Sequence, residues 1–187
     1  MEIRPLKLEG TYAIQLKAHR DDRGYFVETY CERVFREHGL VTAWVQENQS
    51  LSARKGLIRG LHFQRPPHAQ TKLVRVVAGA AWDVFVDLRR SSPTYGRWDA
   101  LELSEENQVI AYIPRGFAHG FCTLTERAIV TYKVDDYYAP DCDTGLRWND
   151  ETLGIPWPAA EAILSPKDRA QPLFRDFVSP FYYYNAT

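Results

Sequence analysis

Two short stretches of this sequence bring histidine and charged side chains together in patterns typical of a catalytic cavity. In the first, glycines flank Arg59 and His62, and Lys72 follows ten residues after the histidine. In the second, a Pro-x-Gly turn at 114–116 delivers His119 to the start of a predicted strand. Imidazole has a pKa of about 6.5, which suits proton transfer near neutral pH. If Lys72 begins a strand antiparallel to the one that bears His62, both side chains enter one cavity.

Each candidate also has an ordinary structural interpretation when it is taken alone. A lone histidine is more often a core or loop residue than a catalyst. Tyr132 in an alternating strand fits packing, Lys72 fits a solvated strand start, and Asp168 fits a turn. Asp83 and Asp87 fit either a pocket or ion pairs with nearby arginines. The combination of these residue types, rather than any one of them, favours a functional site.

The elements that must position these residues are mostly short strands. Strand-length segments with turn signals between them predict an antiparallel sandwich or barrel. Short helices are predicted at 32–38, where Val34 and Phe35 face inward and Gly39 ends the helix, and at 159–164. The predicted strands cover residues 25–30, 72–77, 81–89, 98–104, 108–113, 121–124 and 129–137.

The segment 81–89 alternates strictly between two faces. One face is apolar and the other is largely polar; the two sets are Trp82, Val84, Val86 and Leu88, and Asp83, Phe85, Asp87 and Arg89. A strand that lines a wet pocket has this pattern, and so does a solvent-facing strand with one aromatic residue. We expect 89–90 to be an exposed basic pair. The aromatic tail at 177–184 is expected to pack on the body or on a partner subunit.

Composition limits the class of protein. The 187 residues, 45% hydrophobic and 25% charged, fit one folded domain spanning 1–187. Lys plus Arg is 23 and Asp plus Glu is 24, which argues against a nucleic-acid-binding surface. The longest apolar run, 78–82, is far shorter than a membrane span, and the N-terminal residues contain no apolar signal core. Three cysteines without CxxC spacing favour a reducing cytoplasm.

The two histidine stretches resemble the two cupin motifs. Residues 114–119 match P-x-G-x-x-H, and 56–64 resemble G-x-x-x-x-x-H-x-H with Gln64 in place of the second histidine. Cupins are double-stranded β-helices, or jelly rolls, and many bind a metal through three histidines and a glutamate. Because only His62 and His119 occupy matching places, too few ligands are present for a divalent metal, and we predict no metal site.

The whole chain resembles the dTDP-4-dehydrorhamnose 3,5-epimerases, a cupin-fold family that acts without metal or other cofactor. The resemblance runs from about residue 4 to about 175. It implies an all-β jelly roll with short peripheral helices. The matching blocks include DRGYFVE at 22–28, QENQS at 46–50, KGLIRGLHFQ at 55–64, QTKLV at 70–74, IPRGFAHGF at 113–121, WND at 148–150 and LSPKD at 164–168.

The resemblance implies a chemical role for five residues. Epimerisation beside a ketone needs a base on one face of the sugar, an acid on the other and a partner for the enolate oxygen. His62 matches the base, Asp168 the carboxylate that fixes its tautomer, and Tyr132 the acid. Lys72 matches the enolate partner, and His119 a hydrogen-bond partner of the sugar. The implied reaction converts dTDP-4-dehydro-6-deoxy-D-glucose to dTDP-4-dehydro-β-L-rhamnose, a step in dTDP-L-rhamnose supply for polysaccharide.

The resemblance also implies a set of substrate contacts. Arg23 and Arg59 match positions that hold the diphosphate, and Tyr138 matches the aromatic residue that stacks on thymine. Asp143 stands where the family usually has glutamate, so its side chain is one methylene shorter. The remaining implied contacts are Phe26, Glu28, Gln46, Asn48 and Lys167.

Two alternatives to this reaction remain open on the sequence. The same residues would serve a monoepimerase at C3 or C5 only, or an epimerase of another 4-keto nucleotide sugar. A different class of protein is a metal-binding or non-catalytic cupin that only binds a sugar. The resemblance further implies a small-molecule dTDP-sugar substrate and a homodimer with N-terminal strands exchanged between subunits, with no nucleic-acid or membrane partner.

Overall fold

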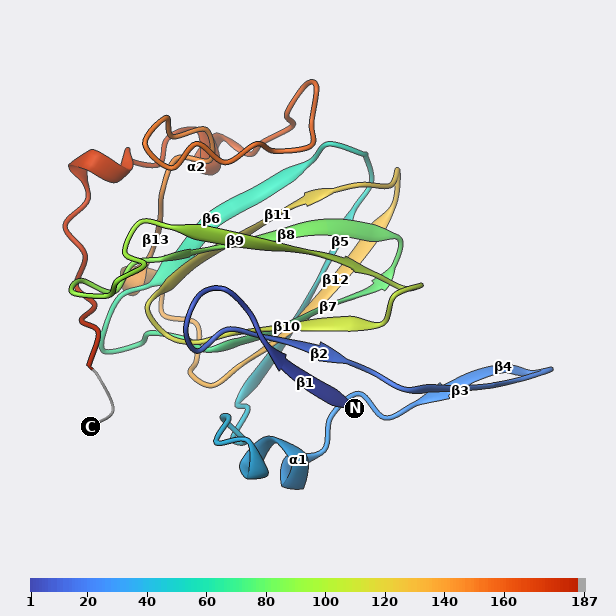
Figure 1. The fold of residues 1–187 in the computed structure, drawn as a ribbon. Coiled ribbons are helices and arrows are strands. Elements are labelled where there is room, and N and C mark those ends of the chain that lie inside the picture. Colours follow the sequence, from blue (N-terminus) through green and yellow to red (C-terminus); the bar gives the residue numbers. More distant parts are fainter. Residues whose placement is uncertain (185–187) are drawn as a thin grey trace.

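The chain forms two antiparallel β-sheets that face each other, with short helices at the periphery (Figure 1). The structure is a computed structural model and describes residues 1–184. This arrangement confirms the predicted all-β jelly roll. In chain order the elements are β1 (Glu2–Pro5), β2 (Tyr12–Gln15), β3 (Ala18–Asp21), β4 (Gly24–Val27), α1 (Glu32–Glu37), β5 (Gln46–Ser52), β6 (Ile58–Gln64), β7 (Lys72–Ala78), β8 (Ala80–Asp87), β9 (Trp98–Ser104), β10 (Val109–Ile113), β11 (Phe117–Thr123), β12 (Ala128–Val134), β13 (Asp143–Gly145) and α2 (Pro166–Arg169), with 3-10 turns at Pro140–Cys142 and Phe174–Asp176.

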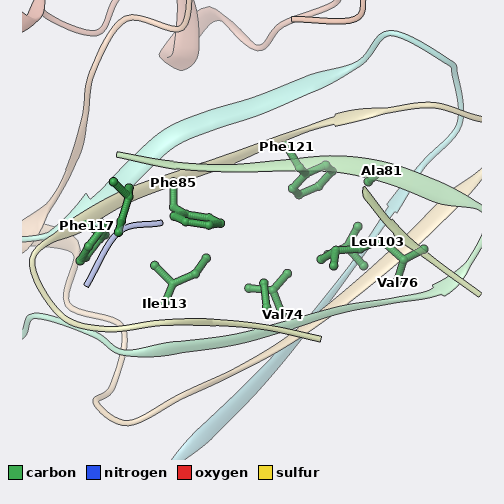
Figure 2. Close-up of a cluster of buried hydrophobic side chains, with 11 residues drawn as sticks. Val74, Val76, Ala81, Phe85, Leu103, Ile113, Phe117 and Phe121 are labelled. Carbon is green, nitrogen blue, oxygen red and sulfur yellow. The ribbon is translucent and has the colours of Figure 1, made fainter. Parts of the chain in front are cut away.

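The main core lies between a six-stranded and a five-stranded sheet. The six-stranded sheet has the order β1-β2-β10-β7-β12-β5, and the five-stranded sheet has the order β13-β6-β11-β8-β9. Val74 and Ile113 from the first sheet meet Phe85, Phe117 and Phe121 from the second (Figure 2). Because the side chains of a strand alternate between faces, each strand gives only every second residue to this core. The residues that do not enter this core are therefore available to line the site or to pack against the segments that cover the sheets.

The five-stranded sheet is covered on its outer face as well. Trp82, Val84, Val86 and Leu88 pack there against residues of the C-terminal segment, including Phe181. The alternation predicted for 81–89 is confirmed, and its alternative as a solvent-facing strand is wrong. Both faces of β8 are buried because the segment after β13 folds back across the sheet (Figure 1).

The helices show one confirmed and one wrong prediction. Helix α1 occupies the predicted place, Phe35 is fully buried, and Gly39 follows with a φ of +67°. Residues 159–164 are not helical. The amide of Ile163 instead donates to the carbonyl of Gly56 in a bridge to the start of β6, and the only helix nearby in the described chain is α2. The helices of residues 1–184 are too short to cross a membrane.

A two-stranded hairpin made of β3 and β4 projects from the body (Figure 1). Within residues 1–184 its two strands pair only with each other. Tyr25 is 47% exposed and Phe26 is 73% exposed. An isolated hairpin is marginally stable in water, and exposed aromatic side chains at its tip are costly unless something covers them.

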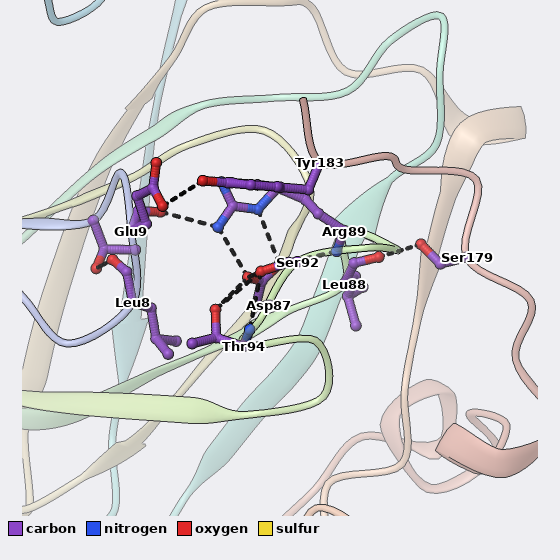
Figure 3. A network of polar contacts seen from close by, with 10 residues as sticks. Leu8, Glu9, Asp87, Leu88, Arg89, Ser92, Thr94, Ser179 and Tyr183 are labelled. Atoms are coloured by element: carbon purple, nitrogen blue, oxygen red, sulfur yellow. Dashed lines mark hydrogen bonds and ion pairs between the residues drawn. The ribbon is translucent and has the colours of Figure 1, made fainter. Parts of the chain in front are cut away.

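The aromatic tail packs on the body through an arginine that was expected to be exposed. The side chain of Arg89 is only 13% exposed, so that expectation is wrong. Its guanidinium lies over the rings of Phe117 and Tyr183, at 4.6 and 5.1 Å from their centroids, and pairs with Asp87 at 2.9 Å. Asp87 also accepts hydrogen bonds from Ser92 and Thr94 (Figure 3). The local charge pattern could not predict that the tail covers Arg89, because the tail comes from a distant part of the chain.

The Asp87→Asn variant should be strongly destabilised. The carboxylate is fully buried, and the hydrogen bonds from Arg89, Ser92 and Thr94 hold its pKa below the usual range despite burial. Removing one partner of a buried ion pair lowers the free energy of unfolding by about 3–5 kcal/mol. Urea denaturation at neutral pH measures this loss. The difference between the two proteins should begin to shrink as the pH falls below about 4, because the unfolded chain then binds a proton at Asp87 while the native carboxylate, with its lowered pKa, stays charged to lower pH.

Asp21→Asn is the matched control, because Asp21 pairs with Arg23 on the exposed hairpin. An exposed pair contributes little to stability, so its urea midpoint should remain near that of the unmodified protein. Equal midpoints for Asp87→Asn and Asp21→Asn would contradict the structural role given to Asp87.

Candidate active site

Seven of the predicted site residues line one cavity of about 580 Å³. A smaller cavity of about 260 Å³ adjoins it and shares His62, Lys72, Tyr132 and Lys167. The two cavities therefore form one continuous site, and the smaller cavity is called its outer end below. The predicted residues of the larger cavity are Arg59, His62, Lys72, His119, Tyr132, Lys167 and Asp168, and the smaller cavity adds Gln46, Asn48, Tyr138 and Asp143.

The pairing of β6 with β11 places the two histidines directly opposite each other. His62 and His119 are partners in this antiparallel register, which shifts between His119 and Phe121. Gly60 has a φ of +130°, and a Cβ added there would lie 2.5 Å from the Cα of Gly120. Only glycine tolerates this backbone conformation and so close an approach. The glycine spacing of both histidine stretches therefore has a packing reason.

Asp168 backs His62 from the first turn of α2. The Oγ of Ser165 accepts a hydrogen bond from the Asp168 amide at 3.1 Å and begins the helix. His62 Nε2 lies 2.5 Å from Asp168 Oδ1, and Asp168 is 3% exposed. Burial alone would raise the pKa of Asp168, but the hydrogen bonds from His62 and Ser165 lower it below the usual value. The aspartate is therefore charged at neutral pH and favours the His62 tautomer that carries its proton on Nε2.

This tautomer leaves Nδ1 of His62 as a base directed at the cavity. Nδ1 has no hydrogen-bond partner in residues 1–184, and it is absent from the buried unpartnered atoms of that region. Because His62 lines both cavities, the free nitrogen is accessible from them. A neutral imidazole nitrogen in this position can accept a proton from carbon, and the resulting imidazolium is stabilised by Asp168.

Tyr132 and Lys72 lie on the neighbouring strands β12 and β7. Burial raises the pKa of Tyr132, and the charge of Asp143 raises it further, so the phenol keeps its proton at neutral pH. Burial lowers the pKa of Lys72 to about 8, against the opposing effect of Asp143 and Asp83. The Lys72 ammonium lies 5.9 Å from the centre of the Tyr132 ring. The pair therefore offers a proton donor and a cation side by side.

The outer end of the site is built around Asp143. Its Oδ2 accepts a hydrogen bond from the Tyr138 hydroxyl at 3.1 Å and forms an ion pair with Lys167. The Tyr138 amide donates to Gln46 Oε1 at 3.0 Å, which ties the loop to β5. The aspartate thus holds two neighbouring substrate candidates in place. Its direct contact with a nucleotide stays a prediction.

Gln64, at the position of the second cupin histidine, has a structural role. Its side-chain amide donates to the carbonyls of His68 and Tyr137 at 2.7 and 3.1 Å, and its oxygen accepts from the Ala139 amide at 2.8 Å. Gln64 therefore holds the loop that carries Tyr138. Within residues 1–184, no group of three or more His, Cys, Asp or Glu side chains is placed to hold a metal ion.

Three predicted substrate contacts lie away from this site in the single chain. Arg23 and Phe26 are on the projecting hairpin and line a separate surface depression. Arg23 pairs there with Asp21 at 2.5 Å. Glu28 is exposed just beyond β4. Their role in binding substrate stays a prediction.

Sequence reasoning left the partner of Asp83 open and missed the apolar wall of the cavity. His119 Nε2 lies 2.7 Å from Asp83 Oδ2, so the partner is a histidine and not an arginine. The polar face of the alternating segment 81–89 was the available signal. The apolar wall includes Ile163 and Leu164. It was missed because the segment was predicted to be helical.

Comparisons with known proteins agree on one family. A family model described as dTDP-4-dehydrorhamnose 3,5-epimerase matches residues 5–176. An enzyme of that name from Methanothermobacter thermautotrophicus is 48% identical over 87% of this chain and 88% of its own. A crystal structure of the Bacillus anthracis enzyme, with TDP and PPi bound, has a TM-score of 0.90 at 48% identity and covers 92% of this chain and 98% of its own. A Legionella pneumophila dTDP-6-deoxy-D-glucose-3,5-epimerase in complex with dTDP-4-keto-L-rhamnose has a TM-score of 0.93 at 39% identity and covers 98% and 99%.

Lys72 should titrate near pH 8 in the unliganded protein, well below an ordinary lysine. The expectation follows from the burial that lowers its pKa to about 8. Heteronuclear NMR of labelled lysine side chains measures the midpoint, and Lys72→Met identifies the signal by its loss. Asp143→Asn should move the midpoint lower still, because the charge of Asp143 favours the ammonium form. A Lys72 midpoint at the ordinary lysine value would contradict this description of the cavity.

Proposed function

This chain belongs to the dTDP-4-dehydrorhamnose 3,5-epimerase family, and we propose that its cavity converts dTDP-4-dehydro-6-deoxy-D-glucose to dTDP-4-dehydro-β-L-rhamnose. The activity is that of an isomerase acting on a sugar nucleotide in dTDP-L-rhamnose biosynthesis. The observation that carries the proposal is the common cavity of His62, Tyr132 and Lys72, with His62 backed by Asp168.

The proposed reaction begins with proton abstraction beside the sugar ketone. C3 and C5 both flank the carbonyl at C4, so loss of a proton from either carbon gives an enolate. Nδ1 of His62 takes this proton, and the electron pair of the C–H bond moves onto the C4 oxygen. The Asp168 carboxylate stabilises the imidazolium that forms. No electron leaves the substrate, and the step needs no redox cofactor.

Inversion follows when a proton returns to the opposite face of the carbon. Tyr132 serves as the donor, since burial raises its pKa and keeps the phenol protonated. The proton moves from the phenol to carbon, and the C4 ketone is restored. Solvent then returns a proton to the tyrosinate and takes one from the imidazolium. The same cycle at the second carbon completes the 3,5-epimerisation.

Lys72 is the proposed electrostatic partner of the enolate oxygen. It is a half-buried cation beside the proton donor, and it carries its charge at pH 7 because its pKa is about 8. A preorganised donor of this kind lowers the barrier by about 2.7–4 kcal/mol. That is roughly a hundredfold to a thousandfold in rate.

The nucleotide part of the substrate is assigned to the outer end of the site. Arg59 is exposed, and in the described part of the chain its guanidinium donates hydrogen bonds only to Ser52 Oγ and the Leu51 carbonyl, both at 3.3 Å. It is therefore available for phosphate oxygens. Tyr138 is 55% exposed and is held by Asp143 and Gln46, which suits a stacking platform for a base.

We further infer that the enzyme works as a homodimer in the cytoplasm. Arg23, Phe26 and Glu28 lie on or beside a projecting hairpin that has no cover in one chain, and a second copy would both cover it and receive these residues. A symmetric exchange would complete two equal sites. The cytoplasmic location is supported by the three cysteines, which form no disulfide and suit a reducing compartment.

Turnover in deuterated water should place deuterium at both C3 and C5 of the sugar. Each inversion removes one proton from carbon and adds one from the Tyr132 hydroxyl, whose hydrogen exchanges with the solvent. Mass spectrometry and NMR of the product locate the label. His62→Asn should lose both exchange and turnover, and Tyr132→Phe should lower kcat by about 10²–10⁴-fold through loss of the donor. Thermal unfolding of each variant controls for loss of the fold.

The position of the label also separates the alternative functions. Label at one carbon only would replace the proposal by a monoepimerase. No label at either carbon, with retained binding of the nucleotide sugar, would leave a non-catalytic sugar-binding cupin.

Mixing two inactive variants should restore activity if the hairpin completes the partner's site. Arg23→Ala damages the hairpin and His62→Asn damages the cavity. In a mixed dimer with exchanged hairpins, one site receives both intact parts. An equal mixture of subunits, refolded together, should recover about a quarter of the native activity per site. His62→Asn mixed with Tyr132→Phe is the control and should recover nothing, since both residues come from one body. Equal recovery in both mixtures, or in neither, would contradict the exchange.

A further inference from the structure

Two aspartates on the same face of β8 have very different surroundings. Asp87 is fully buried and accepts hydrogen bonds from the side chains of Arg89, Ser92 and Thr94 (Figure 3). Asp83 is 1% exposed, yet its only hydrogen-bond partner in residues 1–184 is Nε2 of His119 at 2.7 Å. Its second oxygen, Oδ1, is buried there without a partner.

This contrast indicates that Asp83 does not serve stability as Asp87 does. A buried carboxylate is costly unless its oxygens are satisfied, and a single partner leaves most of that cost standing. Asp87 meets the requirement with several donors, whereas Asp83 meets it with one. The contribution of Asp83 must therefore be sought in its effect on His119.

The effect on His119 is the choice of tautomer. A carboxylate beside Nε2 favours the neutral imidazole with its proton on that atom, which leaves the lone pair on Nδ1. Nδ1 of His119 has no hydrogen-bond partner in the described chain and is absent from the buried unpartnered atoms of that region. Since His119 lines the larger cavity, this nitrogen is the polar atom that it presents to a ligand.

The position of His119 determines which part of the substrate it meets. His119 lies directly opposite His62 in the pairing of β6 with β11, and both side chains line the larger cavity. Its free nitrogen is therefore close to the ring carbons from which His62 is proposed to remove a proton. The groups beside those carbons that can donate a hydrogen bond are the ring hydroxyls. A hydroxyl can either donate or accept a hydrogen bond, and an unprotonated Nδ1 selects the arrangement in which the hydroxyl donates.

We propose that Asp83 is a positioning residue, which holds His119 with its proton on Nε2 so that Nδ1 accepts a hydrogen bond from a hydroxyl of the substrate's sugar ring. The proposal rests on the sugar-nucleotide activity proposed above. It assigns His119 the role of an acceptor rather than a proton donor. It also distinguishes the two histidine–carboxylate pairs: one moves a proton and the other orients the ring.

Lys72 offers a second route by which Asp83 could act. Asp83 is one of the two carboxylates whose charge favours the ammonium form of Lys72. Loss of Asp83 would then weaken stabilisation of the enolate rather than recognition of the ring. The experiment must therefore separate an effect that passes through His119 from one that passes through Lys72.

Nitrogen-15 NMR of labelled histidine tests the tautomer in the unliganded protein without any activity. His119 should carry its proton on Nε2 and show an unprotonated Nδ1 at neutral pH, with His119→Gln identifying its signals. Asp83→Asn should populate the other tautomer as well. Proton on Nδ1 in the unmodified protein would overturn the proposal, as would an unchanged tautomer in Asp83→Asn. This measurement stands even if the epimerase activity proposed above is disproved.

Calorimetric binding of dTDP-glucose and of dTDP tests the role toward the sugar. One lost hydrogen bond should weaken dTDP-glucose about tenfold in Asp83→Asn and leave dTDP, which has no sugar ring to bind there, unchanged. The double variant Asp83→Asn/His119→Gln should bind no more weakly than His119→Gln alone. Equal weakening of both ligands would indicate a structural role and overturn the proposal. Additivity with His119→Gln, together with non-additivity with Lys72→Met, would assign the effect to Lys72 and overturn it as well.

Discussion

The close approach of β6 and β11 is the constraint on which the site depends. Gly60 and Gly120 allow the two backbones to come together where any side chain would collide. The resulting register sets His62 opposite His119, and each imidazole then meets a carboxylate at Nε2. Both rings consequently present Nδ1 to one cavity. A site of this kind is more precise on paired strands than on loops, because the ladder fixes the backbone of both histidines at once.

The rest of the fold keeps that register rigid. The five-stranded sheet carries β6 and β11 and is buried on both faces, by the main core on one side and by the C-terminal segment on the other. Asp87 and Arg89 fasten the tail beside the turn that precedes His119 (Figure 3). The Arg89 guanidinium is also stacked on Phe117, the first residue of β11. The Asp87 carboxylate at this end is satisfied by donors from Arg89, Ser92 and Thr94, as stable packing requires. The incompletely satisfied Asp83 lies at the opposite, functional end of the same strand.

Local patterns predicted α1, β4 and the strands from β7 to β12, but they missed β1–β3, β5 and β13. They also could not show the partners that come from distant parts of the chain. The alternation of 81–89 placed the residues on the correct faces, because a strand of period two follows from side-chain direction alone. It could not show that the tail covers Arg89 or that His119 pairs with Asp83. The helix expected at 159–164 failed for a related reason: hydrogen bonds to the start of β6 hold the segment extended, and tertiary contacts override weak local propensity. The roles of the site residues came from resemblance to a family, while their common cavity came from the structure.

The charges of the site bear on the proposed role of Lys72 as the cation beside the enolate oxygen. Three carboxylates of the site each form one ion pair, namely Asp168 with His62, Asp83 with His119 and Asp143 with Lys167. Within the described chain this leaves Arg59 and Lys72 without an ion pair. A nucleoside diphosphate adds negative charge beside them, which favours the ammonium form, and the enolate adds more at the moment of reaction. The pKa of Lys72, about 8 in the empty cavity, must therefore rise when substrate binds. Asp143 and Asp83 offset only part of the cost of burying the Lys72 ammonium. In the proposed reaction the anionic substrate would supply the remaining stabilisation of that charge.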